Sequence, residues 1–105
     1  MAEAFNDLTL PAAKAARYAA LAEEVAAVLA GEPNLTARLA TVASMLAQAF
    51  ERFFWTGFYL VDPAKPDELV VGPYQGTLGC LRIAFGRGVC GTAAAERRTV
   101  IVPDV

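Results

Sequence analysis

The sequence of 105 residues contains no histidine. This absence excludes serine–histidine–aspartate and cysteine–histidine catalysis, and every zinc site that uses histidine. The two cysteines are too few to close a structural zinc site, which takes four ligands from the protein. We therefore expect no metal site. Any chemistry of this chain has to depend on thiols, carboxylates, hydroxyls and backbone donors.

Clusters of positive charge and long apolar runs are absent as well. Nine Lys and Arg against eleven Asp and Glu give a net charge of −2, and the adjacent basic pair Arg97-Arg98 follows Glu96. Nucleic-acid binding needs a basic stripe that neutralises phosphates, so we expect no nucleic-acid partner. No stretch suggests a membrane span or a signal peptide. We therefore expect a cytoplasmic location, where Cys80 and Cys90 are reduced or transiently redox-active.

A hydrophobic fraction of 56% is sufficient for the core of one domain, residues 1–105. Residues 1–10 are expected to form a loose arm. Apolar residues then recur at spacings of three and four, which predicts two helices separated by Gly31 and Pro33. These residues are Tyr18, Leu21, Val25, Val28 and Leu29 in the first helix, and Leu35, Leu39, Val42, Leu46 and Phe50 in the second. Asn34 is a suitable N-cap for the second helix, so we predict a helical hairpin.

After the hairpin, short aromatic and β-branched runs are typical of strands. The four runs are FFWTGFYLV, ELVVGPY, CLRIAF and TVIVP. A turn-rich loop containing Pro63 and Pro66 joins the first two, which are expected to pair antiparallel. Gly72-Pro73 is expected to end the second strand, and a short helix is expected between the third and the fourth. Helices followed by antiparallel strands indicate the α+β class.

The segment GRGVCG, residues 86–91, matches the G-x-G-x-x-G pattern of dinucleotide-binding turns. However, the segment from Cys80 to Val102 is too short for the β-α-β unit of roughly 30 residues in which such turns occur. No acidic residue lies about 20 positions further on to hold a ribose. We therefore interpret the glycines as a strand-to-helix turn that needs positive φ or close packing.

Two cysteines lie on either side of this turn. Cys90 is at the start of the predicted helix, where unpaired N–H groups and the helix dipole stabilise a thiolate, and Arg87 adds positive potential. Cys80 follows Gly79 at the entry to a predicted strand. Each cysteine can also be a small buried hydrophobic residue. The residues alone support the structural and the redox interpretation about equally.

Trp55 and Tyr59 are four residues apart in a predicted strand and therefore share one face. Two aromatic rings on one face can enclose a polarised methyl–sulfur group. The other interpretation is core packing, which is the usual role of aromatic residues in strands, and the residues alone do not decide between the two. The neighbouring phenylalanines are expected in the core: Phe53, Phe54 and Phe58.

The run LVVGPYQGTLGCLRIAFGRGVCGTAAAERRTVIVPDV resembles the free methionine-R-sulfoxide reductases. Sequences of that family show a G-P-[FY]-Q-G turn, an Ala-Cys or similar pair, and G-[KR]-G-V-C-G-x-A before a V-P-D-V segment. WTGFYLV resembles the family's tryptophan-containing first strand, and the match covers residues 15–105. The resemblance implies a GAF fold, commonly dimeric, that reduces free L-methionine R-sulfoxide without a metal or organic cofactor.

The resemblance also implies a catalytic cycle and roles for four residues. A cysteine thiolate attacks the sulfoxide sulfur, and the resulting sulfenic acid condenses with a second cysteine to a disulfide. Thioredoxin or a similar dithiol then restores the enzyme. By position, Cys80 resembles the principal resolving cysteine and Cys90 a second recycling cysteine. Trp55 and Tyr59 resemble the aromatic wall around the methyl group of the substrate.

The sequence departs from the family after V-P-D-V. In the family, the nucleophilic cysteine and the carboxylates that hold the substrate follow this segment, whereas this chain has no residue after Val105. We therefore expect a partial GAF domain, truncated at its C-terminus and inactive alone, from a parent protein that is a reductase. The alternative is a non-catalytic GAF module that binds a small molecule or dimerises.

Overall fold

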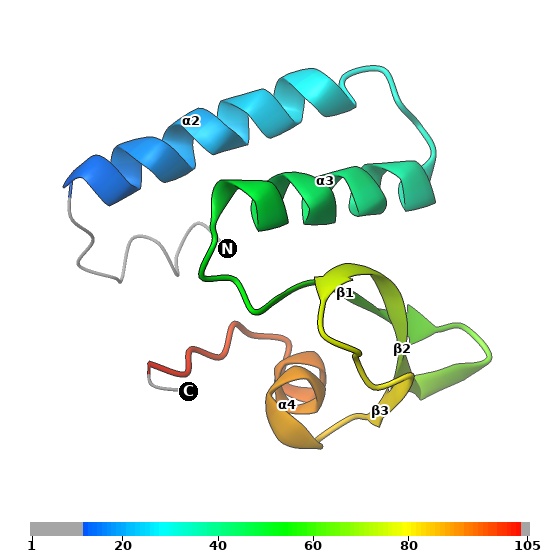
Figure 1. Cartoon of the computed structure of the whole chain (residues 1–105). Coiled ribbons are helices and arrows are strands. Elements are labelled where there is room, and N and C mark those ends of the chain that lie inside the picture. The colour runs from blue at the N-terminus through cyan, green and yellow to red at the C-terminus, as the bar shows by residue number, and fades with distance from the viewer. Residues whose placement is uncertain (1–11, 104–105) are drawn as a thin grey trace.

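The computed structural model describes residues 12–103, so the expected arm, residues 1–10, lies outside the described residues. The elements are α2 (Ala12–Leu29), α3 (Leu35–Ala49), β1 (Trp55–Asp62), β2 (Lys65–Gly76), β3 (Arg82–Ala84) and α4 (Gly88–Glu96) (Figure 1). The three strands form one antiparallel sheet in the order β1-β2-β3. This arrangement confirms the predicted α+β class. None of the helices in the described part is long and apolar enough to cross a membrane.

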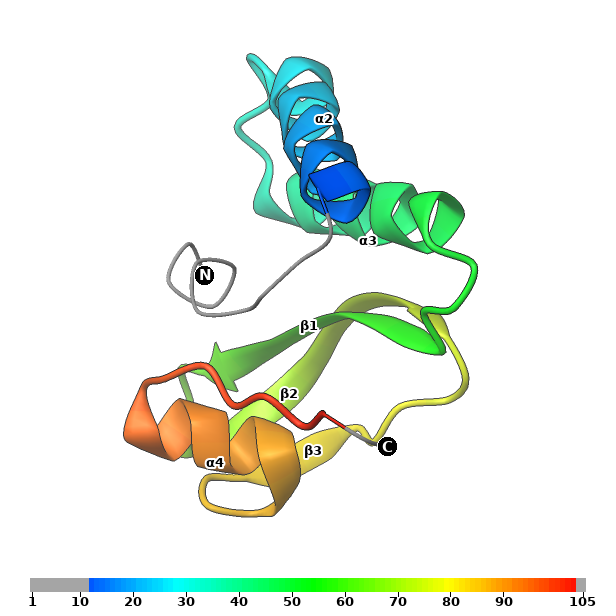
Figure 2. The ribbon, with the colours of Figure 1, turned by 90° about the vertical axis from the view of Figure 1, so that its left-hand side faces the viewer.

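Helices lie on both sides of this sheet. α2 and α3 form the predicted hairpin, and α3 packs against β1 and β2. Figure 2 shows α4 on the other side of the sheet from the hairpin, next to β3. The buried apolar residues of the described part are Ala43 and Phe50, at and just after α3, and Leu69 in β2. The core therefore lies where α3 meets the sheet, while α2 has no buried residue.

The turn of the hairpin follows from its sequence. The side chain of Asn34 accepts a hydrogen bond from the Ala37 N–H at 2.9 Å, which satisfies one of the free donors of the first turn of α3. Gly31 has a φ of +81°, a conformation that glycine adopts without a steric penalty. The predicted apolar stripes are wrong at Val28 and Leu35, which are 58% and 61% exposed at the end where the two helices join.

The loop between β1 and β2 is shorter than predicted. Asp62 pairs with Lys65, so that only Pro63 and Ala64 form the turn. The Asp62 carboxylate accepts a hydrogen bond from the Ala64 N–H at 2.9 Å. An aspartate that bonds a backbone N–H two residues on stabilises a tight turn locally, which is why the long loop is not needed.

The predicted end of β2 at Gly72-Pro73 is wrong, because a β-bulge carries the strand past these two residues to Gly76. In the pairing of β1 with β2, Gly72 and Pro73 together oppose a single residue, Phe58. The unpaired position of a bulge accommodates a proline, which has no N–H to give to a regular ladder.

The predicted fourth strand is also wrong. Residues 99–103 follow α4 without pairing to β1, β2 or β3. β-branched residues favour a strand only where a neighbouring strand gives them a surface to pack against. The short helix expected before this segment is confirmed as α4.

Two of the three phenylalanines expected in the core lie outside it. Phe53 and Phe54 are 42% and 77% exposed, because they lie in the connection between α3 and β1, before the alternation of the strand begins. Phe58, inside β1, is half-buried. Phe53 still stacks on Phe50, with ring centroids 4.7 Å apart.

Candidate functional site

Three aromatic side chains, Trp55, Tyr59 and Tyr74, stack together on β1 and β2 and form what we call the aromatic cluster. The ring centroids of Trp55 and Tyr59 are 5.7 Å apart with an interplanar angle of 18°. Those of Trp55 and Tyr74 are 5.2 Å apart at 21°. The structure thus brings together the predicted pair, Trp55 and Tyr59. It adds Tyr74, which was not singled out from the sequence because its position opposite Gly57 depends on the pairing of two strands.

Gly57 makes room for this cluster. It pairs with Tyr74 across the two strands. A Cβ atom on Gly57 would lie 2.2 Å from the Cβ of Tyr74 and 2.8 Å from the carbonyl oxygen of Pro73. Both distances are far below van der Waals contact, so any side chain here would push the strands apart. The glycine of the WTGFY segment is therefore required by the packing of Tyr74.

The loop that carries Cys80, residues 77–81, is hydrogen-bonded to the aromatic cluster through its backbone. The hydroxyl of Tyr59 donates to the carbonyl oxygen of Cys80 at 2.8 Å. The backbone N–H of Gly79 donates to the hydroxyl of Tyr74 at 3.3 Å. Two neighbouring residues of the loop are therefore held by two different rings of the cluster, while the side chain of Cys80 stays exposed.

The indole N–H of Trp55 is buried, and within residues 12–103 it has no hydrogen-bond partner. Gly79 lies close to it, since a Cβ atom on Gly79 would be 3.2 Å from the indole nitrogen and 3.2 Å from the hydroxyl oxygen of Tyr59. Buried donors in folded proteins are nearly always paired. The site therefore contains one buried donor, beside the aromatic rings, without a partner among the described residues.

The glycine-rich turn before α4 has the geometry that its sequence predicted. Gly86 and Gly88 have φ values of +89° and +60°, which favour glycine. A Cβ atom on Gly91 would lie 2.5 Å from the carbonyl oxygen of Ala84, so α4 approaches β3 more closely than any side chain would permit. These contacts confirm the structural interpretation of GRGVCG.

Cys90 is the third residue of α4, as predicted. The N-cap residue of this helix is Arg87, whose side chain makes no capping hydrogen bond. Both Cys80 and Cys90 are free thiols and exposed, so the interpretation of these cysteines as small buried hydrophobic residues is wrong. Within the described part of the chain, no group of acidic or thiol side chains is arranged to hold a metal ion.

The surroundings of the Tyr59 hydroxyl raise its pKa. Burial raises the pKa of Tyr59 above its ordinary value of 10.0, and negative charge on Cys80 and on Cys90 raises this pKa further. With a pKa above 10.0, the Tyr59 hydroxyl stays protonated at neutral pH and donates to the carbonyl oxygen of Cys80.

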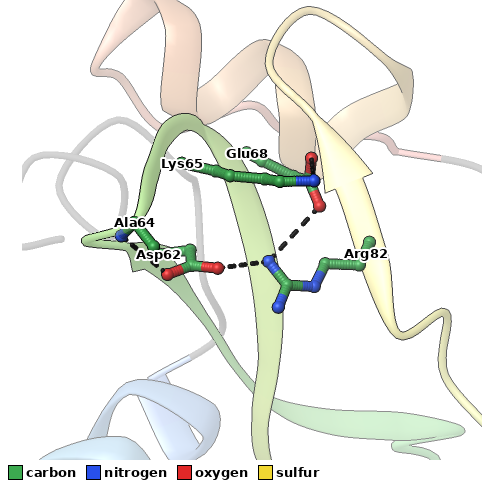
Figure 3. Close-up of polar contacts among 5 residues, drawn as sticks. All are labelled: Asp62, Ala64, Lys65, Glu68 and Arg82. Atoms are coloured by element: carbon green, nitrogen blue, oxygen red, sulfur yellow. Dashed lines mark hydrogen bonds and ion pairs between the residues drawn. The ribbon is translucent and has the colours of Figure 1, made fainter.

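An ion-pair network fixes the strand that follows Cys80. Arg82 in β3 pairs with Asp62 at the end of β1 and, at 3.3 Å, with Glu68 in β2. Lys65 lies 4.0 Å from the other oxygen of Glu68. Figure 3 shows the Arg82 guanidinium reaching both carboxylates. All three strands are thus tied together two residues after Cys80, which anchors the far end of its loop.

We expect Arg82→Gln to destabilise the fold more at neutral than at acidic pH. The hydrogen bond from Arg82 holds the pKa of Asp62 below its ordinary value of 3.8, and the Ala64 N–H lowers this pKa further. A carboxylate with a depressed pKa stabilises the fold above the unfolded pKa, and the contribution is lost as pH falls through the folded pKa. Urea unfolding from pH ~7 to ~3 would measure the difference in the free energy of unfolding between the wild type and the variant. This difference should shrink as pH falls.

Arg98→Gln is a matched control for this experiment. Arg98 forms an exposed ion pair with Glu96, beyond the sheet, and exposed pairs contribute little to stability. The control should therefore change the free energy of unfolding only slightly at every pH. A loss for Arg82→Gln that stays constant down to acidic pH would show that the charge of Asp62 is not what Arg82 stabilises.

A cavity of about 760 Å³ lies elsewhere, between the start of α2 and the end of α3. Its lining includes Lys14, Arg17, Tyr18, Phe50 and Phe53, but no residue of the aromatic cluster and neither cysteine. The guanidinium of Arg17 lies 4.7 Å from the centroid of the Phe50 ring and donates to the carbonyl oxygen of Ala49. This cavity is therefore separate from the candidate site.

No family model matches the sequence, but individual proteins do. The chain is 49% identical over 92 residues to GAF domain-containing protein A of Dictyostelium discoideum, covering 88% of this chain and 56% of that protein. It is 42% identical over 88 residues to the free methionine-R-sulfoxide reductase of Escherichia coli (strain K12), covering 84% of this chain and 52% of the relative. The chain thus spans about half the length of the curated relatives that it matches.

A solved structure agrees with these relatives. The X-ray structure of free methionine-R-sulfoxide reductase from Neisseria meningitidis, in complex with its substrate, superposes with a TM-score of 0.81 at 51% sequence identity. The superposition covers 88% of this chain and 54% of that chain.

Proposed function

Because this chain belongs to the free methionine-R-sulfoxide reductase family and has a GAF fold, we propose that it serves the reduction of free L-methionine R-sulfoxide to L-methionine. The observation that carries the proposal is an exposed thiol, Cys80, whose loop is hydrogen-bonded to a stacked aromatic cluster. Tyr59 stacks on Trp55 and binds the backbone of Cys80. The proposed net reaction converts a sulfoxide and a dithiol into a thioether, a disulfide and water.

The proposed cycle requires three thiols. The thiolate of a nucleophilic cysteine, which we propose follows the V-P-D-V segment in the parent protein, attacks the sulfoxide sulfur. Methionine leaves, so that the sulfoxide is reduced by two electrons and the cysteine is oxidised to a sulfenic acid. The thiolate of Cys80 then attacks the sulfenic sulfur, a disulfide forms, and hydroxide leaves and is protonated to water. Cys90 serves as a second thiol in recycling.

Two rings of the aromatic cluster supply the binding surface in this proposal, and the third, Tyr74, does not contact the substrate. Trp55 and Tyr59 receive the methyl–sulfur end of the substrate, because the faces and edges of aromatic rings attract polarised methyl groups and sulfur. No metal or organic cofactor enters the proposed cycle.

The exposure of Cys80 also supports a macromolecular reductant. A thioredoxin-like dithiol has to attack a disulfide sulfur directly, and the Cys80 side chain is exposed. Such reductants keep thiols reduced in the cytoplasm, which is the location that we propose. We also propose a homodimer as the working assembly. Size-exclusion chromatography coupled to light scattering tests the homodimer, and a monomer at micromolar concentration would contradict it.

A chimera tests the proposed function directly. In this chimera, Val105 is followed by the C-terminal segment of the Neisseria meningitidis reductase that lies beyond the matched region. We expect the chimera to release methionine from free methionine R-sulfoxide over many turnovers with thioredoxin, thioredoxin reductase and NADPH. The 105-residue chain alone should release none and retain both thiols in a thiol assay.

The same experiment distinguishes the alternative, a non-catalytic GAF module. A folded chimera that binds methionine sulfoxide by calorimetry but releases no methionine would favour the binding module. A folded chimera that neither binds nor reduces the sulfoxide would contradict both ideas for this ligand. Far-UV circular dichroism and the fluorescence of the single tryptophan establish whether the chimera has folded.

A further inference from the structure

Cys80 lies in a loop that has few attachments of its own. The flanking side chains of Leu78 and Leu81 are 92% and 74% exposed and therefore do not anchor it. At the end of the loop, the carbonyl oxygen of Leu81 accepts a hydrogen bond from the Val71 N–H at 3.0 Å. Between this bond and the end of β2, the position of the backbone depends on the aromatic cluster.

Two phenol hydroxyls hold the loop at adjacent residues. One of them accepts a hydrogen bond from the loop, and the other donates one to it. Tyr74 accepts from the N–H of Gly79, and Tyr59 donates to the carbonyl oxygen of Cys80. Both rings also stack on Trp55. Gly79 and Cys80 are therefore each hydrogen-bonded, through the backbone, to a ring that stacks on the indole of Trp55.

We propose that Tyr74 is a positioning residue for Cys80, whose hydroxyl holds the Gly79 N–H while its ring stacks on the indole of Trp55. This inference rests on the proposed function, in which Cys80 resolves the sulfenic acid. Disulfide formation needs the two Cα atoms within about 4.4–6.8 Å and a defined dihedral angle. A loop whose position varies by an ångström or two spends less time in that geometry. The loss of the Gly79–Tyr74 hydrogen bond should therefore slow disulfide formation.

Tyr74 separates positioning from substrate binding better than Tyr59 does. Tyr59 is proposed to contact the substrate, so its removal changes two functions together. In Tyr74→Phe the ring and its stacking on Trp55 remain, and only the acceptor for the Gly79 N–H is lost. The net free energy of a hydrogen bond of this kind corresponds to a rate change of about threefold to tenfold.

The first experiment uses the 105-residue chain and needs no enzyme activity. Cys80 is labelled with a trifluoromethyl thiol reagent in a Cys90→Ser background, and the ¹⁹F signal is compared with and without Tyr74→Phe. We expect one narrow signal in the parent and a shifted or broadened signal in the variant. Amide hydrogen exchange at Gly79 should also accelerate by about threefold to tenfold. Tyr18→Phe, on α2, is the matched control and should change neither readout.

An unchanged ¹⁹F signal together with unchanged exchange at Gly79 would overturn the positioning role. The fluorescence of Trp55 and the urea midpoint show whether Tyr74→Phe remains folded. If it does not, exchange at Gly79 in the wild-type chain decides the question, because an N–H held by Tyr74 must be protected and an unprotected one refutes the bond.

The second experiment uses the chimera described above and separates the two proposals. In a single turnover, Tyr74→Phe should leave the rate of methionine release unchanged and slow disulfide formation by about threefold to tenfold. Equal slowing of both steps would indicate a merely structural effect and contradict the positioning role. An inactive chimera in which the ¹⁹F and exchange results hold would refute the proposed function while retaining the placement of Cys80 by Tyr74.

Discussion

Replacing Cys80 with serine in the chimera is expected to stop catalysis after about one methionine per chain. The nucleophilic cysteine can still reduce one sulfoxide, but its sulfenic acid then lacks the thiol that condenses with it. Steady-state turnover with thioredoxin should therefore fall to background, while the first turnover keeps its rate. Quenched-flow measurement of methionine, followed by mass spectrometry of the dimedone-trapped sulfenic acid, would quantify both.

Cys90→Ser is the matched control for this substitution, because Cys90 is also an exposed thiol but is assigned only an assisting role. This variant should keep multiple turnover at a reduced rate and accumulate little dimedone adduct. If Cys80→Ser turns over as the parent chimera does, Cys80 is not the resolving cysteine. If only Cys90→Ser stops after one turnover, the roles of the two cysteines are exchanged.

The helical part of the fold could be predicted because its signals are local. The spacing of apolar residues and the capping side chain of Asn34 lie within a few residues of the structure that they determine. The glycine turn before α4 is equally local, since Gly86 and Gly88 need positive φ whatever surrounds them. Predictions of this kind are confirmed with little dependence on distant contacts.

The errors concern residues whose structure is decided by distant partners. Gly72-Pro73 looks like the end of a strand, yet the pairing with β1 absorbs the proline in a bulge. The β-branched segment after α4 looks like a strand, yet within the described residues no strand pairs with it. A sequence pattern indicates which secondary structure a residue favours. Whether a strand forms there depends on a neighbouring strand that can pair with it.

In the candidate site, too, the local features could be predicted from the sequence and the long-range contacts could not. The aromatic pair Trp55 and Tyr59 could be placed on one face from their spacing alone. The hydrogen bond from Tyr59 to Cys80 could not be predicted, because it joins residues 21 positions apart and involves a side-chain hydroxyl and a backbone carbonyl. Tyr74 was missed for the same reason, since the bulge that brings it opposite Gly57 is a property of the pairing of two strands.

Gly57→Ala is expected to have the largest effect on stability, because its clash involves backbone atoms that cannot rotate away. The added Cβ would lie 2.2 Å from the Cβ and 2.6 Å from the Cα of Tyr74. Relief requires β1 and β2 to separate, which disrupts the ladder and the stacking of Trp55 on Tyr74. We expect a loss of about 3 kcal/mol in the free energy of unfolding. This corresponds to a fall in melting temperature of roughly 12–24 °C for a domain of this size.

Gly31→Ala separates this clash from the general cost of replacing a glycine. Gly31 has a φ of +81°, and a Cβ atom there would meet nothing within 4 Å, so only backbone strain of about 1 kcal/mol is expected. Thermal unfolding followed by circular dichroism gives both values, and the emission of Trp55 should shift in Gly57→Ala alone. Equal losses in the two variants, with unchanged emission, would mean that the strands tolerate a side chain at Gly57. The stacking of Tyr74 on Trp55 would then not depend on the close approach at this position.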